Sequence, residues 1–153
     1  MTRVLRAALV AMAMIAALAF AAGCGNEEQN DYADDVNSAQ ESFLEEMTAA
    51  ASQANPANAG QADQLIGEMQ GAIDSFVSDL EGIEPPEEVA DLHDELITTM
   101  SDIGGEIGEL GDALTSGNPQ QAAQAAAQLT TAVSSAQTEV TSIIDQINAE
   151  FGN

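Results

Sequence analysis

Carboxylates and the single histidine gather around a Pro-Pro pair near the middle of the chain, where they are suited to bind a metal ion. Oxygen ligands of this kind are those that Ca²⁺ and Mg²⁺ prefer. The candidate ligands are Glu84, Glu87, Asp91 and His93, within a wider group of acids formed by Asp79, Glu81, Glu88, Asp94 and Glu95. A Ca²⁺ site at this acidic turn is therefore one hypothesis for the function.

The spacing of these acids favours a different interpretation. An EF-hand loop requires acids at alternate positions, a central glycine and a terminal glutamate, and no run here has that pattern. Acids at the start of a helix are favoured by the helix dipole and by exposure to solvent. We therefore expect a solvated acidic turn and no cofactor, with Ca²⁺ binding as the alternative.

His93 is the only histidine, which restricts the catalytic chemistry available. One histidine does not make a zinc site without cysteine or further histidine ligands, carboxylate-rich sites aside. No serine lies in a nucleophile-elbow sequence, and no Lys or Arg follows Arg6 to stabilise an anionic transition state. We expect no enzymatic activity. Instead, His93 is expected to pack in or beside the core and to hydrogen-bond to the first helix, with a pKa raised by any nearby acids.

The only cysteine, Cys24, ends a segment with the character of a secretion signal. Arg3 and Arg6 precede an apolar run over residues 7–22. That run is shorter than the roughly 20 residues that span a membrane and suits a cleaved signal. Small residues, Ala21-Ala22-Gly23, stand before Cys24, whose thiol is a nucleophile for a diacylglycerol chain.

Ala21-Ala22-Gly23-Cys24 resembles the lipobox of bacterial lipoproteins, although leucine is commonest where Ala21 stands. The resemblance implies a lipid on Cys24, a signal peptide over residues 1–23, and an extracytoplasmic protein anchored to the cell membrane. Ala19-Phe20-Ala21 is also a site for ordinary signal peptidase. A plain secreted protein and an uncleaved anchor therefore remain alternatives.

The charge is extremely one-sided. The chain has 26 Asp and Glu residues but two Lys and Arg residues, and both arginines precede Cys24. Nothing after Cys24 can neutralise phosphate, which excludes nucleic acid as a partner. We expect an envelope partner that is cationic or bridged by divalent ions. The oligomeric state is left open.

Four helical patterns follow a predicted flexible tether at residues 24–30. Apolar residues recur at steps of three and four over residues 31–54, 62–82, 86–116 and 119–151, which predicts four amphipathic helices. Asn55-Pro56, Pro85-Pro86 and Asn118-Pro119 separate them, and Asn118 is expected to cap the last helix with Pro119 at its first position. Short connections predict an antiparallel up-down-up-down four-helix bundle over residues 31–153, an all-α fold.

Glycines in the third predicted helix have two explanations. Gly104 and Gly111 lie beside the apolar positions, with Gly105 and Gly108 between them. Such glycines make a hinge or allow a neighbouring helix to come close, and we expect close packing.

A second resemblance covers more of the chain. Asn30-Asp31-Tyr32 and the segment from Leu80 through Pro85-Pro86 to His93 look like parts of small uncharacterised actinobacterial lipoproteins. That resemblance marks Tyr32, Pro85, Pro86 and His93 but implies no activity. We therefore expect a non-catalytic interaction or structural module of the cell envelope. The alternative is a lipoprotein that binds a divalent cation or small ligand near His93.

Overall fold

A computed structural model of the chain describes residues 27–53, 59–115 and 118–152. These residues form four α-helices and one short 3-10 helix, with no strand among them. The helices are α2 (Glu27–Gln53), α3 (Ala59–Glu81), η1 (Glu87–Val89), α4 (Ala90–Thr115) and α5 (Pro119–Glu150). The predicted all-α class with four long helices is confirmed. The predicted signal peptide and Cys24 lie outside the described residues.

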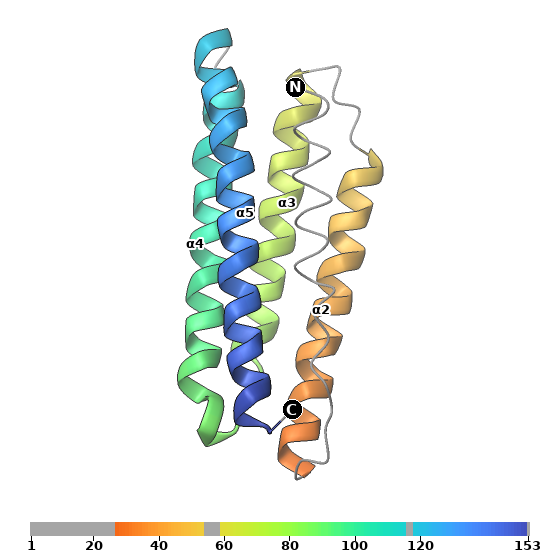
Figure 1. Cartoon of the computed structure of the whole chain (residues 1–153). Helices are drawn as coiled ribbons and strands as arrows, with labels where there is room; N and C mark the ends of the chain where they lie inside the picture. Colours follow the sequence, from red (N-terminus) through yellow and green to blue (C-terminus); the bar gives the residue numbers. More distant parts are fainter. Residues whose placement is uncertain (1–26, 54–58, 116–117, 153) are drawn as a thin grey trace.

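The four long helices lie side by side along a common direction (Figure 1). Each packs against the next one in the chain: α2 against α3, α3 against α4, and α4 against α5. The short helix η1 contacts α4 and α5. Successive elements are therefore neighbours in space, as short connections require.

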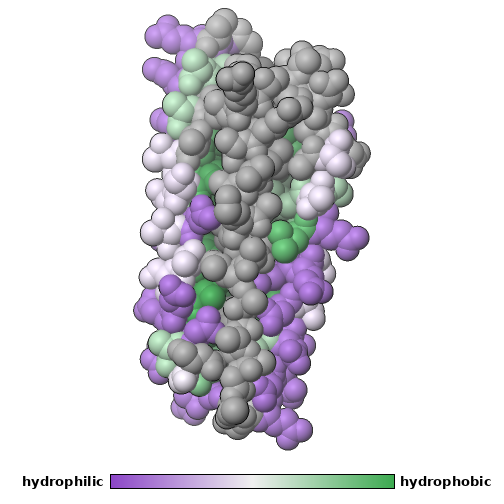
Figure 2. All heavy atoms as spheres, turned by 45° about the vertical axis from the view of Figure 1, so that its right-hand side comes forward, coloured by the Kyte–Doolittle hydropathy of each residue, from purple (hydrophilic) through white to green (hydrophobic). Residues whose placement is uncertain are grey.

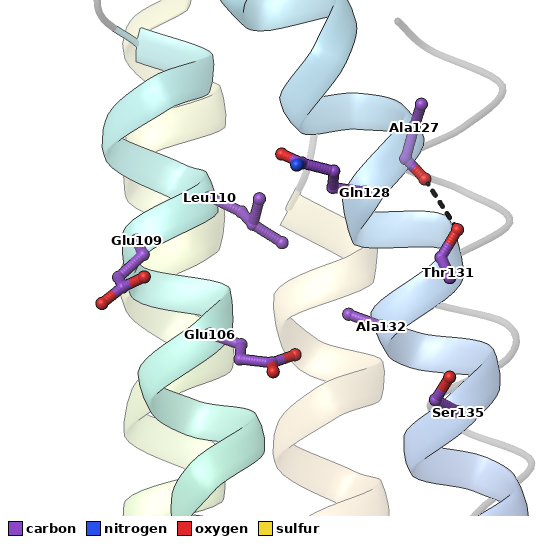
Figure 3. Close-up of a pocket in the computed structure, with 8 residues that line it drawn as sticks. All are labelled: Glu106, Glu109, Leu110, Ala127, Gln128, Thr131, Ala132 and Ser135. Carbon is purple, nitrogen blue, oxygen red and sulfur yellow. Dashed lines mark hydrogen bonds between the residues drawn. The ribbon is translucent and has the colours of Figure 1, made fainter.

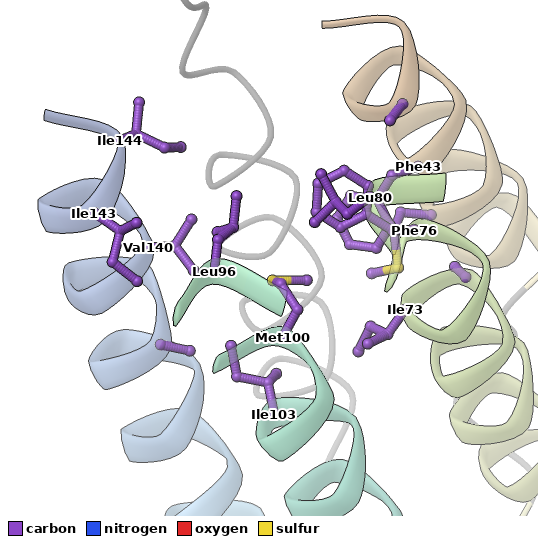
Figure 4. Packing of buried hydrophobic residues seen from close by; sticks show 14 of the residues in the cluster. Phe43, Ile73, Phe76, Leu80, Leu96, Met100, Ile103, Val140, Ile143 and Ile144 are labelled. Atoms are coloured by element: carbon purple, nitrogen blue, oxygen red, sulfur yellow. The ribbon is translucent and has the colours of Figure 1, made fainter. Parts of the chain in front are cut away.

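The core is formed by the apolar positions that the helical spacing predicts. The described apolar residues at these spacings are all buried or half-buried. They are Tyr32, Val36, Ala39, Phe43, Met47 and Ala50 in α2; Leu65, Ile66, Met69, Ile73, Phe76, Val77 and Leu80 in α3; Val89 in η1; Leu96, Met100, Ile103, Ile107, Leu110 and Leu114 in α4; Ala122, Leu129, Val133, Ala136, Val140, Ile143 and Ile147 in α5; and Phe151 just after it. Figure 4 shows several of them meeting between the helices, with Phe43 of α2 stacked on Phe76 of α3 at a ring-centroid distance of 5.1 Å. Burial of this apolar surface is the main stabilising contribution, because no Lys or Arg is present after Arg6 to form salt bridges.

The first helix begins earlier than predicted. α2 starts at Glu27, so residues 27–30 of the predicted tether are helical. Glu27 and Glu28 lie in its first turn, where carboxylates interact favourably with the positive end of the helix dipole. The lack of apolar periodicity in this segment therefore did not prevent helix formation.

The starts of the last two helices differ from each other. A 3-10 turn, closed by a hydrogen bond from Val89 N to Pro86 O, precedes α4, so the predicted single helix from Pro86 is divided at Ala90. At α5 the prediction is confirmed: Asn118 Oδ1 accepts hydrogen bonds from Gln120 N at 3.0 Å and Gln121 N at 3.4 Å. Asn118 thus satisfies two of the donors that every helix N-terminus leaves unpaired.

The glycines of α4 bring α3 and α4 close together, as expected. A Cβ built on Gly104 would lie 3.2 Å from Ile73 Cγ2, and one on Gly111 would lie 2.5 Å from Ile66 Cγ2. A Cβ on Gly108 would collide with the Gln70 amide, whereas Gly105 faces open space. The absence of a side chain at Gly111 therefore lets Ile66 occupy its position in the core.

Candidate functional site

His93 is buried and hydrogen-bonded through both of its ring nitrogens. Its side chain is 2% exposed, as is that of Tyr32 on α2. His93 Nδ1 lies 3.2 Å from the Tyr32 hydroxyl oxygen, and His93 Nε2 lies 3.0 Å from the backbone carbonyl oxygen of Leu80, near the end of α3. The predictions of a packed histidine and of a hydrogen bond to the first helix are confirmed.

The partners of His93 determine where its proton lies. A carbonyl oxygen only accepts hydrogen bonds, so Nε2 must donate to Leu80. In the neutral ring Nδ1 is then an acceptor, and the Tyr32 hydroxyl donates to it. The Leu80 carbonyl also accepts from Ile83 N at 3.0 Å. His93 thereby pairs with one of the carbonyls that the end of a helix leaves without an intrahelical donor.

The pKa of His93 is shifted in the opposite direction to the prediction. Burial lowers this pKa below its ordinary value, although the Leu80 carbonyl and the charge of Asp94 act to raise it. The expectation of a raised pKa was wrong because removal from water outweighs the neighbouring acids. Burial also raises the pKa of Tyr32 well above its usual range. Burial therefore disfavours the charged form of both side chains.

Aromatic contacts extend this cluster to the end of α5. The Tyr32 ring meets His93 edge-on at a centroid distance of 5.7 Å and Phe151 edge-on at 5.9 Å. The cluster of Tyr32, Leu80, His93 and Phe151 thus joins α2, the end of α3, the start of α4 and the residue that follows α5. We call these four residues the polar cluster. Its arrangement is that of a structural linkage, because each polar atom of the histidine ring already has a partner.

The four candidate metal ligands are not brought together. Glu84, Glu87 and Asp91 are exposed, whereas His93 is buried with both nitrogens engaged. Within residues 27–53, 59–115 and 118–152, no group of three or more His, Cys, Asp or Glu side chains is placed to hold a metal ion. The acidic turn therefore has the geometry of a solvated surface.

Two surface grooves, which sequence patterns did not predict, lie between neighbouring helices. The groove between α2 and α3 has a volume of about 430 Å³ and is lined by Asp35, Ser38, Ala39, Ser42, Ser78, Asp79, Gly82 and Ile83. The groove between α4 and α5 has a volume of about 620 Å³ and is lined by Glu106, Glu109, Leu110, Ala127, Gln128, Thr131, Ala132 and Ser135. The spacing of Asp35, Ser38 and Ser42 places them on one helix face and was the available signal for the first groove.

The walls of the two grooves differ in charge. In the α2/α3 groove each helix contributes one carboxylate, Asp35 and Asp79. In the α4/α5 groove both carboxylates come from α4, and the α5 wall is uncharged (Figure 3). In that close-up Glu106 and Leu110 reach toward α5, while Glu109 points away from it. Acidic groups therefore line both sides of only the first of these two grooves.

The outer surface is strongly acidic. All 26 carboxylate side chains belong to described residues, and all except Glu68 are exposed. Hydrophilic side chains cover much of the described surface in the view of Figure 2. α2 carries eight of these acids, and α5 carries Glu139, Asp145 and Glu150. The negative charge is therefore densest on the first helix and sparsest on the last.

Comparison with known proteins assigns a family but no activity. Residues 26–149 match a model described as a family of unknown function (DUF6376). Neither a curated protein nor a solved structure matches the chain. Among the described helices, none has both the length and the apolar character that crossing a membrane requires.

Proposed function

Since the chain belongs to the DUF6376 family of unknown function, we propose its role from its charge, its site geometry and its leader. It acts as a lipid-anchored, extracytoplasmic lipoprotein that is a non-catalytic interaction or structural module of the cell envelope. Its helices form an antiparallel up-down-up-down bundle, and its partner is a cationic envelope protein.

The acidic surface is the observation that carries this proposal. Twenty-six acids and no Lys or Arg follow Cys24, and nearly every carboxylate is exposed. Such a surface repels anionic partners and attracts cationic ones, with an attraction that weakens as salt rises. Because no internal cation competes for these carboxylates, a basic partner meets an unneutralised surface.

The polar cluster supports the non-catalytic part of the proposal. His93 is the only histidine, and both of its ring nitrogens are bonded inside the protein. A general base must lie within hydrogen-bond reach of a substrate proton, and His93 is 2% exposed. Its bonds join helices instead of presenting a reactive nitrogen.

The bundle arrangement is supported by two contacts. Successive helices pack together, which suits short antiparallel connections. Tyr32 near the start of α2 meets Phe151 just after α5. An up-down-up-down bundle brings the start of its first helix and the end of its last to the same end, as this contact requires.

The anchor is tested by expressing the full-length chain and its Cys24→Ser variant in a bacterial host. We expect mass spectrometry of the membrane fraction to find an N-terminal acylated Cys24, and the variant to lose this modification. Stable anchoring needs more than one acyl chain or a second membrane signal, so the number of chains should be measured. An unmodified protein beginning at Ala22 would contradict the anchor.

The interaction is tested with an acetylated, amidated alanine–lysine peptide and a control in which glutamine replaces every lysine. We expect the full-length protein in a neutral detergent to bind the lysine peptide, with affinity falling as NaCl rises, and to bind the glutamine peptide far more weakly. Exposed charges separated by more than ~10 Å are largely screened at 0.1 M salt. Equal binding of the two peptides, or no binding of either, would refute a cationic partner.

A further inference from the structure

Resting on the proposed function, we propose that the α2/α3 groove is where this protein binds a Lys or Arg side chain from a basic segment of its partner protein. The attraction between the acidic surface and the cationic partner is then concentrated at one groove and not spread over the whole surface. The atoms that line the groove determine which side chains it can bind.

The two helices that form the α2/α3 groove each contribute a negative charge. Asp35 lies on the α2 wall and Asp79 on the α3 wall, and both are exposed. The sequence has no Lys or Arg after Arg6 to stand between them. A cation that enters the groove is therefore attracted by a carboxylate on each wall.

The serine hydroxyls of the α2 wall are hydrogen-bonded to their own helix. Ser38 Oγ donates its hydrogen to the backbone carbonyl of Asp34 at 2.9 Å, and Ser42 Oγ donates to that of Ser38 at 3.2 Å. A hydroxyl whose hydrogen is used in this way offers only acceptor lone pairs to a ligand. The α2 wall thus presents hydrogen-bond acceptors: the Asp35 carboxylate and two hydroxyl oxygens.

The acceptors on the α2 wall favour a ligand that carries hydrogen-bond donors. The ammonium of Lys has three donors and no acceptor, and the guanidinium of Arg has five. Both side chains have an aliphatic stem that packs on apolar surface while the charged head stays in a polar site. Ala39 and half-buried Ile83 supply apolar surface in this groove.

The α4/α5 groove is a natural comparison within the same molecule. It is the larger of the two and also contains two carboxylates, Glu106 and Glu109. However, both belong to α4, and Glu109 points away from α5 (Figure 3). A cation there would be held from one side, so we expect this groove to contribute little beyond its general charge.

The main test compares two double variants of the full-length protein that remove the same charge. We expect Asp35→Asn with Asp79→Asn to weaken binding of the alanine–lysine peptide about tenfold, since each exposed pair contributes a few-fold in affinity. Glu106→Gln with Glu109→Gln should weaken it by less than about twofold. Isothermal titration calorimetry at a fixed, moderate salt concentration measures both, after circular dichroism confirms unchanged folding.

A second test leaves the charge unchanged. Ser38→Ala with Ser42→Ala should weaken peptide binding about threefold by removing two acceptors. Ser52→Ala with Ser101→Ala removes two exposed hydroxyls that do not line this groove and should leave binding unchanged.

The outcomes separate the two proposals. Equal losses from the two charge-removing double variants would overturn the groove but leave a diffuse attraction to cationic partners. Failure of the unaltered protein to bind the lysine peptide would overturn both the groove and the cationic partner. A selective loss from the α2/α3 variants, with the α4/α5 variants unaffected, would establish the groove as the site.

Discussion

The polar cluster and the crossing of α3 with α4 hold helices together by opposite means. At the cluster, Tyr32 and His93 bury polar atoms, and each of those atoms is hydrogen-bonded. At the crossing, Gly104 and Gly111 provide space that Ile73 and Ile66 fill. The cluster depends on hydrogen-bonding side chains that must be present. The crossing depends on the absence of a side chain at two glycines.

The difference shows how each region contributes to a defined structure. A buried polar group is tolerated only where its partner is in place, so the cluster disfavours any arrangement that separates α2 from α4. Apolar packing is less directional than hydrogen bonding. The glycine crossing therefore disfavours other helix arrangements only because their shapes fit less well. The two regions should therefore respond differently to substitutions of comparable size.

The largest effect should come from His93→Ala. Removing the ring takes away the hydrogen bond between Tyr32 and His93 and creates a cavity, so we expect the free energy of unfolding to fall by about 2–4 kcal/mol. The Leu80 carbonyl keeps its hydrogen bond from Ile83. Urea denaturation measures the change. Tyr32→Phe, which keeps the ring, should cost about 1–2 kcal/mol, and a negligible cost for both variants would rule out the linkage.

Gly111→Ala should have the next largest effect. The new Cβ would lie 2.5 Å from Ile66 Cγ2, so side chains or backbone must shift. Overpacking of this kind costs about 1–3 kcal/mol, which exceeds the helix propensity gained from alanine. Thermal unfolding followed by circular dichroism should show a lower midpoint. Gly111→Ala should cost less stability in an Ile66→Ala background, which lacks the colliding Cγ2 and Cδ1 atoms. An equal cost in both backgrounds would put close packing at this position in doubt.

The pH dependence of the free energy of unfolding should distinguish the polar cluster from the glycine crossing, because only the cluster contains a histidine. The pKa of His93 is lowered in the folded protein, so the unfolded chain binds the extra proton first as pH falls below about 6.5. Stability is therefore complete above this pH and decreases below it, by at most about 1.4 kcal/mol per pH unit. Urea denaturation between about pH 7 and about pH 5.5 measures this loss of stability. The interval lies above the ordinary pKa values of Asp and Glu, so the carboxylates stay largely charged within it.

A matched variant identifies the source of that dependence. His93→Gln cannot bind the extra proton, and its stability should vary less over the same interval. An unchanged slope in His93→Gln would assign the dependence to the acidic surface instead.

The smallest effect should be a gain in stability from Gly105→Ala. No atom lies within 4 Å of a Cβ built at this position, so the substitution meets no neighbour. Replacing glycine by alanine in a helix interior stabilises it by about 0.5–1 kcal/mol. A small rise in the thermal midpoint would contrast with the fall expected for Gly111→Ala, six residues further along α4. A fall for both variants would indicate that α4 needs flexible glycines, as a hinge would.

Most of the fold could be predicted from the spacing of apolar residues along the helices. The three-and-four spacing of apolar residues placed the core correctly because a helix presents such positions on one face. Asn118-Pro119 predicted a helix start because an amide cap and a proline both suit that position. The early start of α2 at Glu27 was missed because polar residues near a helix end leave no periodic signal.

The candidate site was only partly accessible to the same reasoning. The position of His93 among apolar residues predicted its burial, and Tyr32 lay on the matching face of the first helix. The choice of Leu80 as its second partner depends on where α3 ends relative to α4. The acids Glu84, Glu87 and Asp91 are close to His93 in sequence, but their side chains are exposed whereas that of His93 is buried.

The amino-acid sequence by itself determined the helical class, the core positions, the acidic surface and the need for close packing at Gly104 and Gly111, because these follow from local spacing and composition. Only the tertiary structure decided that His93 is hydrogen-bonded through both ring nitrogens, and that Asp35 and Asp79 line one groove. Those features depend on distances and burial between residues far apart in the chain. Helix packing sets these distances and this burial, and no local pattern encodes them.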